Sequence, residues 1–160
     1  MRILVAFYSK TGATEKVALA LKEALEEKGH NAELAKILPK EELKAARYKK
    51  DGKDIELKNP VLDVQNFDLV IVGTPVWGFC PTPIVLSYLR GLQNTSEKKF
   101  ALFATCTVLP GTTIQRMASI LSTKGGTVTS SLTIRSIFPL DGAKLREAKA
   151  FAEQLAGGQA

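Results

Sequence analysis

The chain has 160 residues, of which 45% are hydrophobic and 24% charged, a balance typical of a folded globular domain and not of a disordered or fibrous chain. Lysine and arginine total 22 against 16 aspartates and glutamates, so the formal net charge is +6. This charge suits several kinds of acidic partner and selects none of them.

Neither membrane insertion nor secretion is expected from the apolar segments of the chain. The longest apolar runs, 69–72 and 100–104, are far shorter than the roughly 18–20 residues that span a bilayer. The apolar run 3–8 is too brief for the core of a signal peptide, and the chain has only two cysteines. We therefore expect a cytoplasmic protein without a membrane span.

Apolar patterns typical of strands alternate along the chain with patterns typical of helices. Continuous β-branched and aromatic runs predict strands covered on both faces, whereas apolar residues at helical spacing predict helices with one buried face. In chain order the sequence predicts a strand at 3–8, a helix that starts after Gly12 and stops at Gly29, strands at 31–37 and 68–73, a helix at 83–92, a strand at 100–105, a helix at 113–124, a strand at 127–137 and a helix at 142–155.

This alternation predicts an α/β fold, a single domain over 1–156 in which helices cover both faces of a parallel sheet. Residues 157–160 are expected to fray. Between the second and third predicted strands, the segment 39–59 contains seven basic and five acidic residues, which indicates an exposed insertion of mixed charge. Within it we expect a short helix at 41–49 and a turn at 51–52.

Ligands of open parallel sheets bind beyond the carboxyl ends of the strands, which directs attention to the loops 9–14, 74–82 and 106–112. The first loop reads Ser9-Lys10-Thr11-Gly12-Ala13-Thr14 and joins a central strand to a helix. Backbone N–H groups at such a helix start, three hydroxyls and a glycine are suited to binding an anion, although the same residues also serve as ordinary helix caps. The loop matches neither the G-x-x-x-x-G-K-[ST] nor the G-x-G-x-x-G pattern.

This strand and loop resemble the FMN phosphate loop of the flavodoxin family, [ST]-x-T-G-x-T, with matches at Ser9, Thr11, Gly12 and Thr14. The resemblance implies a flavodoxin-like, three-layer, doubly wound fold with a five-stranded parallel sheet of order 2-1-3-4-5. It also implies FMN bound noncovalently, with its phosphate held by the hydroxyls and amides of this loop. Lys10 either lends positive charge to the phosphate or is simply solvated.

The second loop, Thr74-Pro75-Val76-Trp77-Gly78-Phe79, holds the only tryptophan of the chain. The resemblance implies that this loop lies along the flavin ring, with Trp77 stacked on it and Gly78 beside the flavin N5. In the alternative interpretation, Trp77 and Phe79 cover the end of the sheet or form a dimer contact.

The resemblance implies that the third loop places backbone donors near the pyrimidine edge of the flavin. The carrier flavodoxins commonly have a second aromatic residue here, but residues 106–113 contain none, so we expect the outer face of the flavin to be open. The cofactor-binding residues predicted in this way are Ser9, Lys10, Thr11, Gly12, Ala13, Thr14, Thr74, Pro75, Val76, Trp77, Gly78, Phe79, Thr105, Cys106, Thr107 and Gly111.

No side chain in these loops is arranged as an acid, base or nucleophile, so no catalytic residue is predicted. The strand ends at Tyr8-Ser9 and Gly73-Thr74 lack the carboxylates that a phosphorelay receiver needs. With a single histidine, His30, and two separated cysteines, no zinc site of the usual spacing can be built. Cys80 and Cys106 are expected to be free thiols, with a redox pair as the less favoured alternative.

The predicted function is therefore that of an FMN-binding protein in electron transfer. One alternative is a small flavin-dependent NAD(P)H or quinone reductase, which the missing second aromatic residue favours, whereas the short chain without an NAD(P)H motif favours the carrier. The other alternative is a flavin-free interaction module. Carrier flavodoxins are usually acidic and this chain is basic, so the predicted partner is an acidic redox protein or a small electron acceptor such as a quinone, and no nucleic acid is expected.

Overall fold

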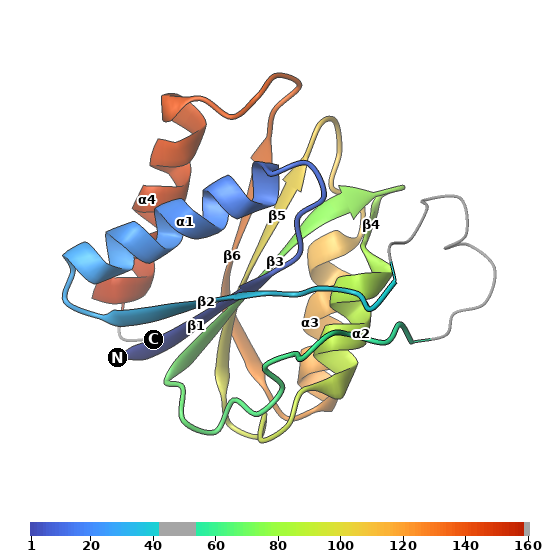
Figure 1. Ribbon diagram of the computed structural model, residues 1–160. Helices are drawn as coiled ribbons and strands as arrows, with labels where there is room; N and C mark the ends of the chain where they lie inside the picture. The colour runs from blue at the N-terminus through green and yellow to red at the C-terminus, as the bar shows by residue number, and fades with distance from the viewer. Residues whose placement is uncertain (42–53, 159–160) are drawn as a thin grey trace.

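The computed structural model describes residues 1–41 and 54–158 (Figure 1). Its elements are β1 (Arg2–Phe7), α1 (Ala13–Glu27), β2 (Asn31–Lys36), β3 (Leu69–Trp77), β4 (Cys80–Pro81), α2 (Pro83–Gly91), β5 (Lys99–Cys106), α3 (Thr113–Thr123), β6 (Thr127–Arg135) and α4 (Gly142–Gly157). The turn expected at 51–52, and all but the first residue of the helix expected at 41–49, lie outside the described residues.

The main sheet has the order β2-β1-β3-β5-β6, and all its neighbouring strands pair in parallel. This is the predicted order 2-1-3-4-5 once the short strand β4 is left out of the numbering, so the predicted fold class is confirmed. The order reverses between β1 and β3, which makes the carboxyl ends of these two strands the switch point of the sheet.

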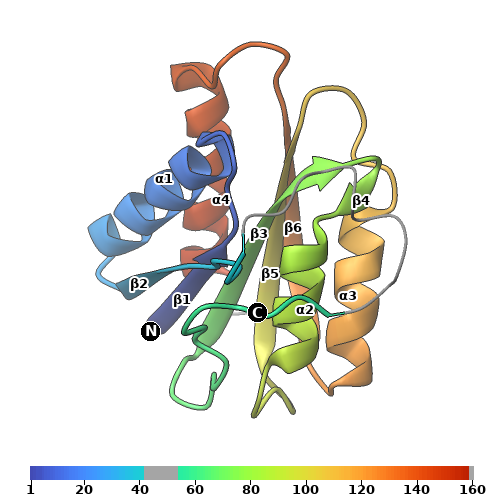
Figure 2. The same ribbon diagram turned by 45° about the vertical axis from the view of Figure 1, so that its right-hand side comes forward.

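Helices cover both faces of the sheet, with α1 and α4 on one face and α2 and α3 on the other (Figure 2). Successive side chains of a strand point to opposite faces, so each central strand supplies both cores. Ile3, Val5 and Phe7 pack in the core under α1 and α4, while Leu4 and Ala6 pack in the core under α2 and α3. The double burial explains the continuous apolar run of β1.

Side-chain caps mark the start of helices α2 and α4. The Thr82 hydroxyl accepts a hydrogen bond from the Val85 N–H at 3.2 Å at the start of α2, and Asp141 accepts from the Lys144 N–H at 3.0 Å at the start of α4. Helix α1 has no side-chain cap, and Gly12 precedes it in the left-handed conformation. The N-terminus of α1 therefore keeps N–H groups that no side chain caps, next to the switch point.

The structure differs from the sequence prediction mainly along the third strand. β3 continues to Trp77, so residues 74–77 belong to a strand and not to a loop. They do so because Val76 and Trp77 pair with β4 in an antiparallel hairpin, which the sequence did not predict. Two smaller differences concern the ends of elements: β6 stops at Arg135, and α4 runs on to Gly157.

Candidate functional site

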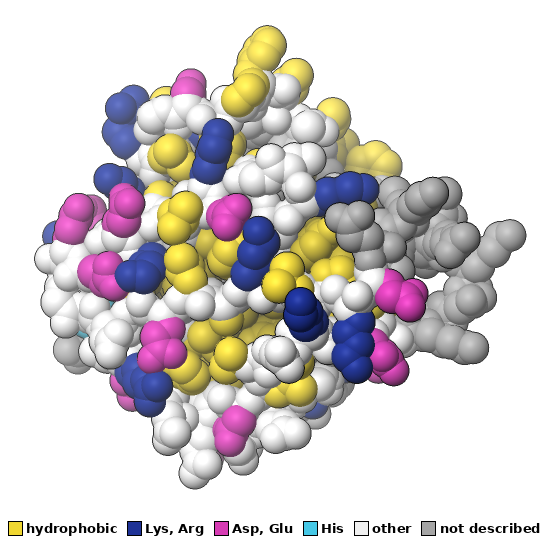
Figure 3. All heavy atoms as spheres, viewed as in Figure 1, with side chains coloured by type: hydrophobic (Ala, Val, Ile, Leu, Met, Phe, Trp, Pro, Cys, Tyr) yellow, Lys and Arg dark blue, Asp and Glu magenta, His cyan; other side chains and the backbone are white. Residues whose placement is uncertain are grey.

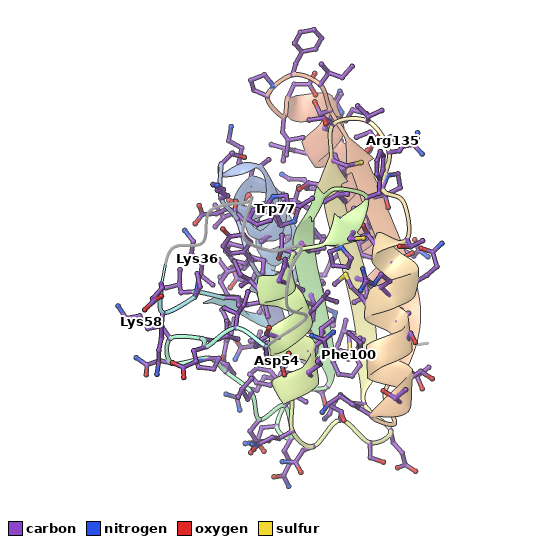
Figure 4. All side chains as sticks on the ribbon, turned by 90° about the vertical axis from the view of Figure 1, so that its right-hand side faces the viewer. Lys36, Asp54, Lys58, Trp77, Phe100 and Arg135 are labelled. Carbon is purple, nitrogen blue, oxygen red and sulfur yellow. The ribbon has the colours of Figure 1, made fainter. Side chains whose placement is uncertain are left out.

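The three loops singled out in the sequence meet at the carboxyl edge of the sheet. β1, β3 and β5 run parallel and end there, beside the N-terminus of α1. In Figure 4, Trp77 at the end of β3 and Arg135 at the end of β6 lie toward one end of the sheet, and Phe100, early in β5, lies toward the other. Just past β1, the Tyr8 N–H donates to the Gly73 carbonyl oxygen at 3.3 Å.

A hydrogen bond to the Ser9 side chain stabilises the turn in the loop 9–14. The Ser9 hydroxyl oxygen accepts a hydrogen bond from the Gly12 N–H at 3.1 Å, and the Gly12 carbonyl accepts from the Lys16 N–H at 3.0 Å. Gly12 has a φ of 97°, and a Cβ placed on it would meet no atom within 4 Å. The main chain at the positive end of α1 therefore faces open space, an arrangement suited to an anion.

The hydroxyls predicted to bind phosphate differ in their surroundings. Thr11 is exposed, as is the neighbouring Lys10, and Ser9 is half-buried. Thr14 is buried, and its Oγ1 lies 2.8 Å from Oγ1 of Thr105 at the end of β5, which is also buried. This hydroxyl pair links the first candidate loop to the third.

Trp77 links the first loop to the second. Its ring is half-buried, not fully exposed, and the Tyr8 ring packs against it edge-on with the ring centroids 5.7 Å apart. The Lys10 ammonium lies 5.5 Å from the centroid of the Trp77 ring, within the range of a cation–π interaction. The tryptophan, the loop lysine and the strand-end tyrosine thus form one cluster at the switch point.

The β3–β4 hairpin turns through Gly78 and Phe79, which have φ values of 58° and 65°. Two central residues with positive φ are typical of the tightest hairpin turns, and for phenylalanine this conformation is uncommon. The Thr112 N–H donates to the Phe79 carbonyl oxygen at 3.1 Å, and a Cβ on Gly111 would lie 2.3 Å from that oxygen. The hairpin tip is therefore held closely against the loop after β5.

The inner part of the hairpin is tied to the fold. Thr74 is buried, and its hydroxyl donates to the Pro75 carbonyl at 2.8 Å and accepts from the Thr82 N–H at 3.2 Å. Pro75 and Val76 are half-buried, and Gly78 is exposed, with open space where a Cβ would stand. The Thr74 side chain thus faces the interior, so any contribution of Thr74 to a ligand would come from its main chain.

Both cysteines lie at this edge as half-buried thiols that form no disulfide. Burial raises the pKa of Cys106, and the Arg135 guanidinium opposes this effect by lowering it. The Cys80 sulfur accepts a hydrogen bond from the Arg116 guanidinium at 3.2 Å. Cys106 is accordingly a neutral thiol near pH 7.

Several residues at this edge were not predicted from the sequence as part of the site. Tyr8 counts there only as the last residue of an apolar run, yet it packs on Trp77. Arg116 and Arg135 give no sequence signal of their own, because their place at the edge depends on how α3 packs on the sheet and how β6 pairs with β5. Thr107 and Gly111, which were predicted, are exposed in the loop after β5.

The opposite edge of the sheet contains a hollow of about 680 Å³, whose lining includes His30, Phe67, Lys98 and Leu155. His30 lies just past the C-terminus of α1, and Leu155 is near that of α4. The lining of the hollow also includes Lys99, Asp68 and Glu97, so charges of both signs surround it.

The described residues contain neither a metal-binding cluster nor a membrane-spanning helix. Within residues 1–41 and 54–158, no group of three or more histidine, cysteine, aspartate and glutamate side chains is placed to hold a metal ion. In the same part of the chain, no helix has the length and apolar character needed to cross a membrane.

No protein-family model and no curated protein sequence matches the chain. Its similarity to solved structures is extensive. Oxidised Flavodoxin 1 from Bacillus cereus superposes with a TM-score of 0.71 at 16% identity, covering 100% of both chains. Oxidised Flavodoxin 2 from the same organism gives 0.71 at 21% identity, covering 98% of each chain. A flavoprotein in complex with FMN from Lactobacillus acidophilus NCFM gives 0.64 at 21% identity, covering 82% of this chain and 92% of that one. The chain therefore has the flavodoxin-like fold.

Proposed function

We propose that this chain binds FMN noncovalently at the carboxyl edge of its sheet and acts in electron transfer. The observation that carries the proposal is the meeting of an anion-binding loop and an aromatic cluster at one point. The Ser9–Gly12 turn stands at the N-terminus of α1, and its neighbour Lys10 lies over the ring of Trp77. A phosphate and a flat aromatic ring on one ligand match these two features.

The residues present fit such a ligand. A Cβ placed on Gly12 or on Gly78 would meet no atom within 4 Å. A ligand can therefore approach the main chain at both glycines. The Ser9 hydroxyl accepts the Gly12 N–H and keeps its own hydrogen for a phosphate oxygen. Bound FMN would supply one-electron and two-electron transfer. The protein would hold the phosphate, orient the ring and exclude water from the Trp77 side.

A second candidate, a small NAD(P)H or quinone reductase, is favoured by one observation. The loop after β5 carries exposed Thr107, Val108 and Leu109, and no aromatic ring that could cover the outer face of a flavin. An uncovered face would admit a small substrate. The two thiols, which form no disulfide, fit a reducing compartment such as the cytoplasm for either function.

The test is a titration of the purified protein with FMN and, in parallel, with riboflavin. We expect quenching of flavin fluorescence and much tighter binding of FMN, because riboflavin lacks the phosphate that the loop would hold. Trp77→Ala should weaken binding of both ligands, whereas Ser9→Ala should weaken FMN binding alone. Leu19→Ala, at an exposed leucine on α1, is the control. Absence of any spectral change with FMN would favour the flavin-free interaction module.

Anaerobic addition of NADPH to the FMN-loaded protein separates the two candidates. A carrier should show no response to NADPH while remaining reversibly reducible by dithionite. Bleaching by NADPH at catalytic rates would instead identify a reductase.

A further inference from the structure

The most exposed large hydrophobic residues of the structure gather at one edge. Among the described residues, five large hydrophobic residues have exposed fractions of 52–79%, and every other one is at or below 47%. We name these five residues the apolar rim: Phe79, Val108, Leu109, Ile137 and Phe138. Apolar groups that cluster on a surface in this way mark interaction sites more often than single exposed residues do.

The apolar rim is one surface because its three loops are bonded to one another. The Thr112 N–H donates to the Phe79 carbonyl at 3.1 Å, which joins the hairpin tip to the loop after β5. The Ser136 N–H donates to the Cys106 carbonyl at 2.9 Å, which joins that loop to the loop before α4. There the Ser136 hydroxyl donates to the Phe138 carbonyl. Figure 3 shows hydrophobic side chains projecting at the top of the molecule, over the β6–α4 loop.

Basic residues outnumber acidic ones in the segments that carry and flank the apolar rim. In the described segments 8–14, 77–80, 106–116 and 135–141, the basic residues are Lys10, Arg116 and Arg135, all exposed. The one acidic residue of these segments is Asp141, whose carboxylate caps α4 through the Lys144 N–H. These segments therefore combine exposed apolar side chains with a net positive charge.

We infer that the apolar rim, with Lys10, Arg116 and Arg135, docks a partner protein whose own surface presents apolar side chains ringed by carboxylates. Aromatic and arginine residues are enriched at protein interfaces, and the planar guanidinium matches a carboxylate in shape as well as charge. That the partner is a redox protein rests on the proposed function, because a protein docked here would cover the edge at which the flavin is held.

Two other occupants fit the charges less well. In a symmetric contact with a second copy of the chain, the rim cations would lie near the same cations of the partner, and like charges across an interface are unfavourable. Lipid-binding clusters typically contain about 4–8 basic residues. The described segments 8–14, 77–80, 106–116 and 135–141 have only three.

The test uses a labelled synthetic peptide in which glutamate alternates with leucine and phenylalanine. Its binding to the full chain is followed by fluorescence anisotropy, without flavin and with FMN. We expect saturable binding that weakens with added salt. A peptide with lysine for glutamate, or with serine for leucine and phenylalanine, should bind at least about tenfold more weakly. Phe138→Ser should weaken binding of the acidic peptide about tenfold or more, as expected for one large apolar side chain.

Matched variants separate docking from general surface effects. Leu19→Ser removes an exposed apolar side chain from α1, and Lys149→Glu reverses an exposed charge on α4. Both should leave peptide binding unchanged, while Arg135→Glu should weaken it severalfold. Peptide binding without any FMN binding would sink the proposed function and leave the docking surface standing. Failure of the acidic peptide to bind, equal effects of Phe138→Ser and Leu19→Ser, or binding instead to anionic vesicles or to a second copy would overturn the inference.

Discussion

The buried hydroxyl pair of Thr14 and Thr105 allows a sharp test of how the candidate site is built. The two oxygens are 2.8 Å apart, and both residues are buried, with exposed fractions of 1% and 7%. Replacing either threonine with valine keeps the size of the side chain and leaves the other hydroxyl without this partner. Each single substitution should therefore lower the free energy of unfolding by about 1–3 kcal/mol.

The double variant Thr14→Val/Thr105→Val should be less destabilised than the sum of the two single variants. With both hydroxyls removed no unsatisfied polar group remains, and such paired replacements are nearly neutral. We expect a coupling free energy of at least about 1 kcal/mol from urea unfolding of the four proteins. Strictly additive losses would refute the pair. FMN titration of the same four proteins would then show whether the Thr14 hydroxyl also serves the phosphate.

Three further predictions follow from single positions. Gly73→Ala should destabilise the fold by about 1–3 kcal/mol or more in urea unfolding, because a Cβ there would lie 2.0 Å from the Phe103 ring. Gly111→Ala should both lower stability and weaken binding of the acidic peptide, because its φ is 58° and its Cβ would meet the Phe79 carbonyl. Since burial raises the pKa of Cys106, iodoacetamide should alkylate it more slowly than a model thiol at pH 8, and the rate should still be rising above pH 9; a plateau below pH 9 would contradict this.

The strands and helices could be predicted from the sequence because their signals are local, whereas the order of the strands was expected from the family resemblance. The apolar run of β1 is buried on both faces, and the α2 start reads directly from Thr82 and Pro83, the capping hydroxyl and the first-turn proline. The sequence likewise predicted a helix that starts after Gly12, and α1 begins at Ala13. In each case, residues close in the chain determine the result.

The features that the sequence did not predict depend on contacts between distant residues. The hairpin of β3 and β4 has no strong turn signal, since Phe79 is an unusual residue at positive φ and is held there by the loop around Gly111. The ring of Trp77 packs against that of Tyr8, which lies 69 positions earlier. The position of Arg116 and Arg135 at the same edge depends on the packing of α3 and β6 beside β5.

The β3–β4 hairpin connects the two proposed roles of this edge. Its inner residue Trp77 packs on Tyr8 and lies beneath Lys10, so it belongs to the proposed flavin site. Its outer residue Phe79 belongs to the apolar rim and is bonded to the loop after β5. Only Gly78 separates them, so a displacement of the hairpin would move the ring cover and the docking surface together. A partner protein that docks on Phe79 would therefore act on the residue that covers the proposed flavin, through a single turn of main chain. Beside the apolar rim, Lys10, Arg116 and Arg135 place positive charge at the proposed cofactor edge. These three local charges, and not the net charge of the whole chain, favour a partner with carboxylates at this edge.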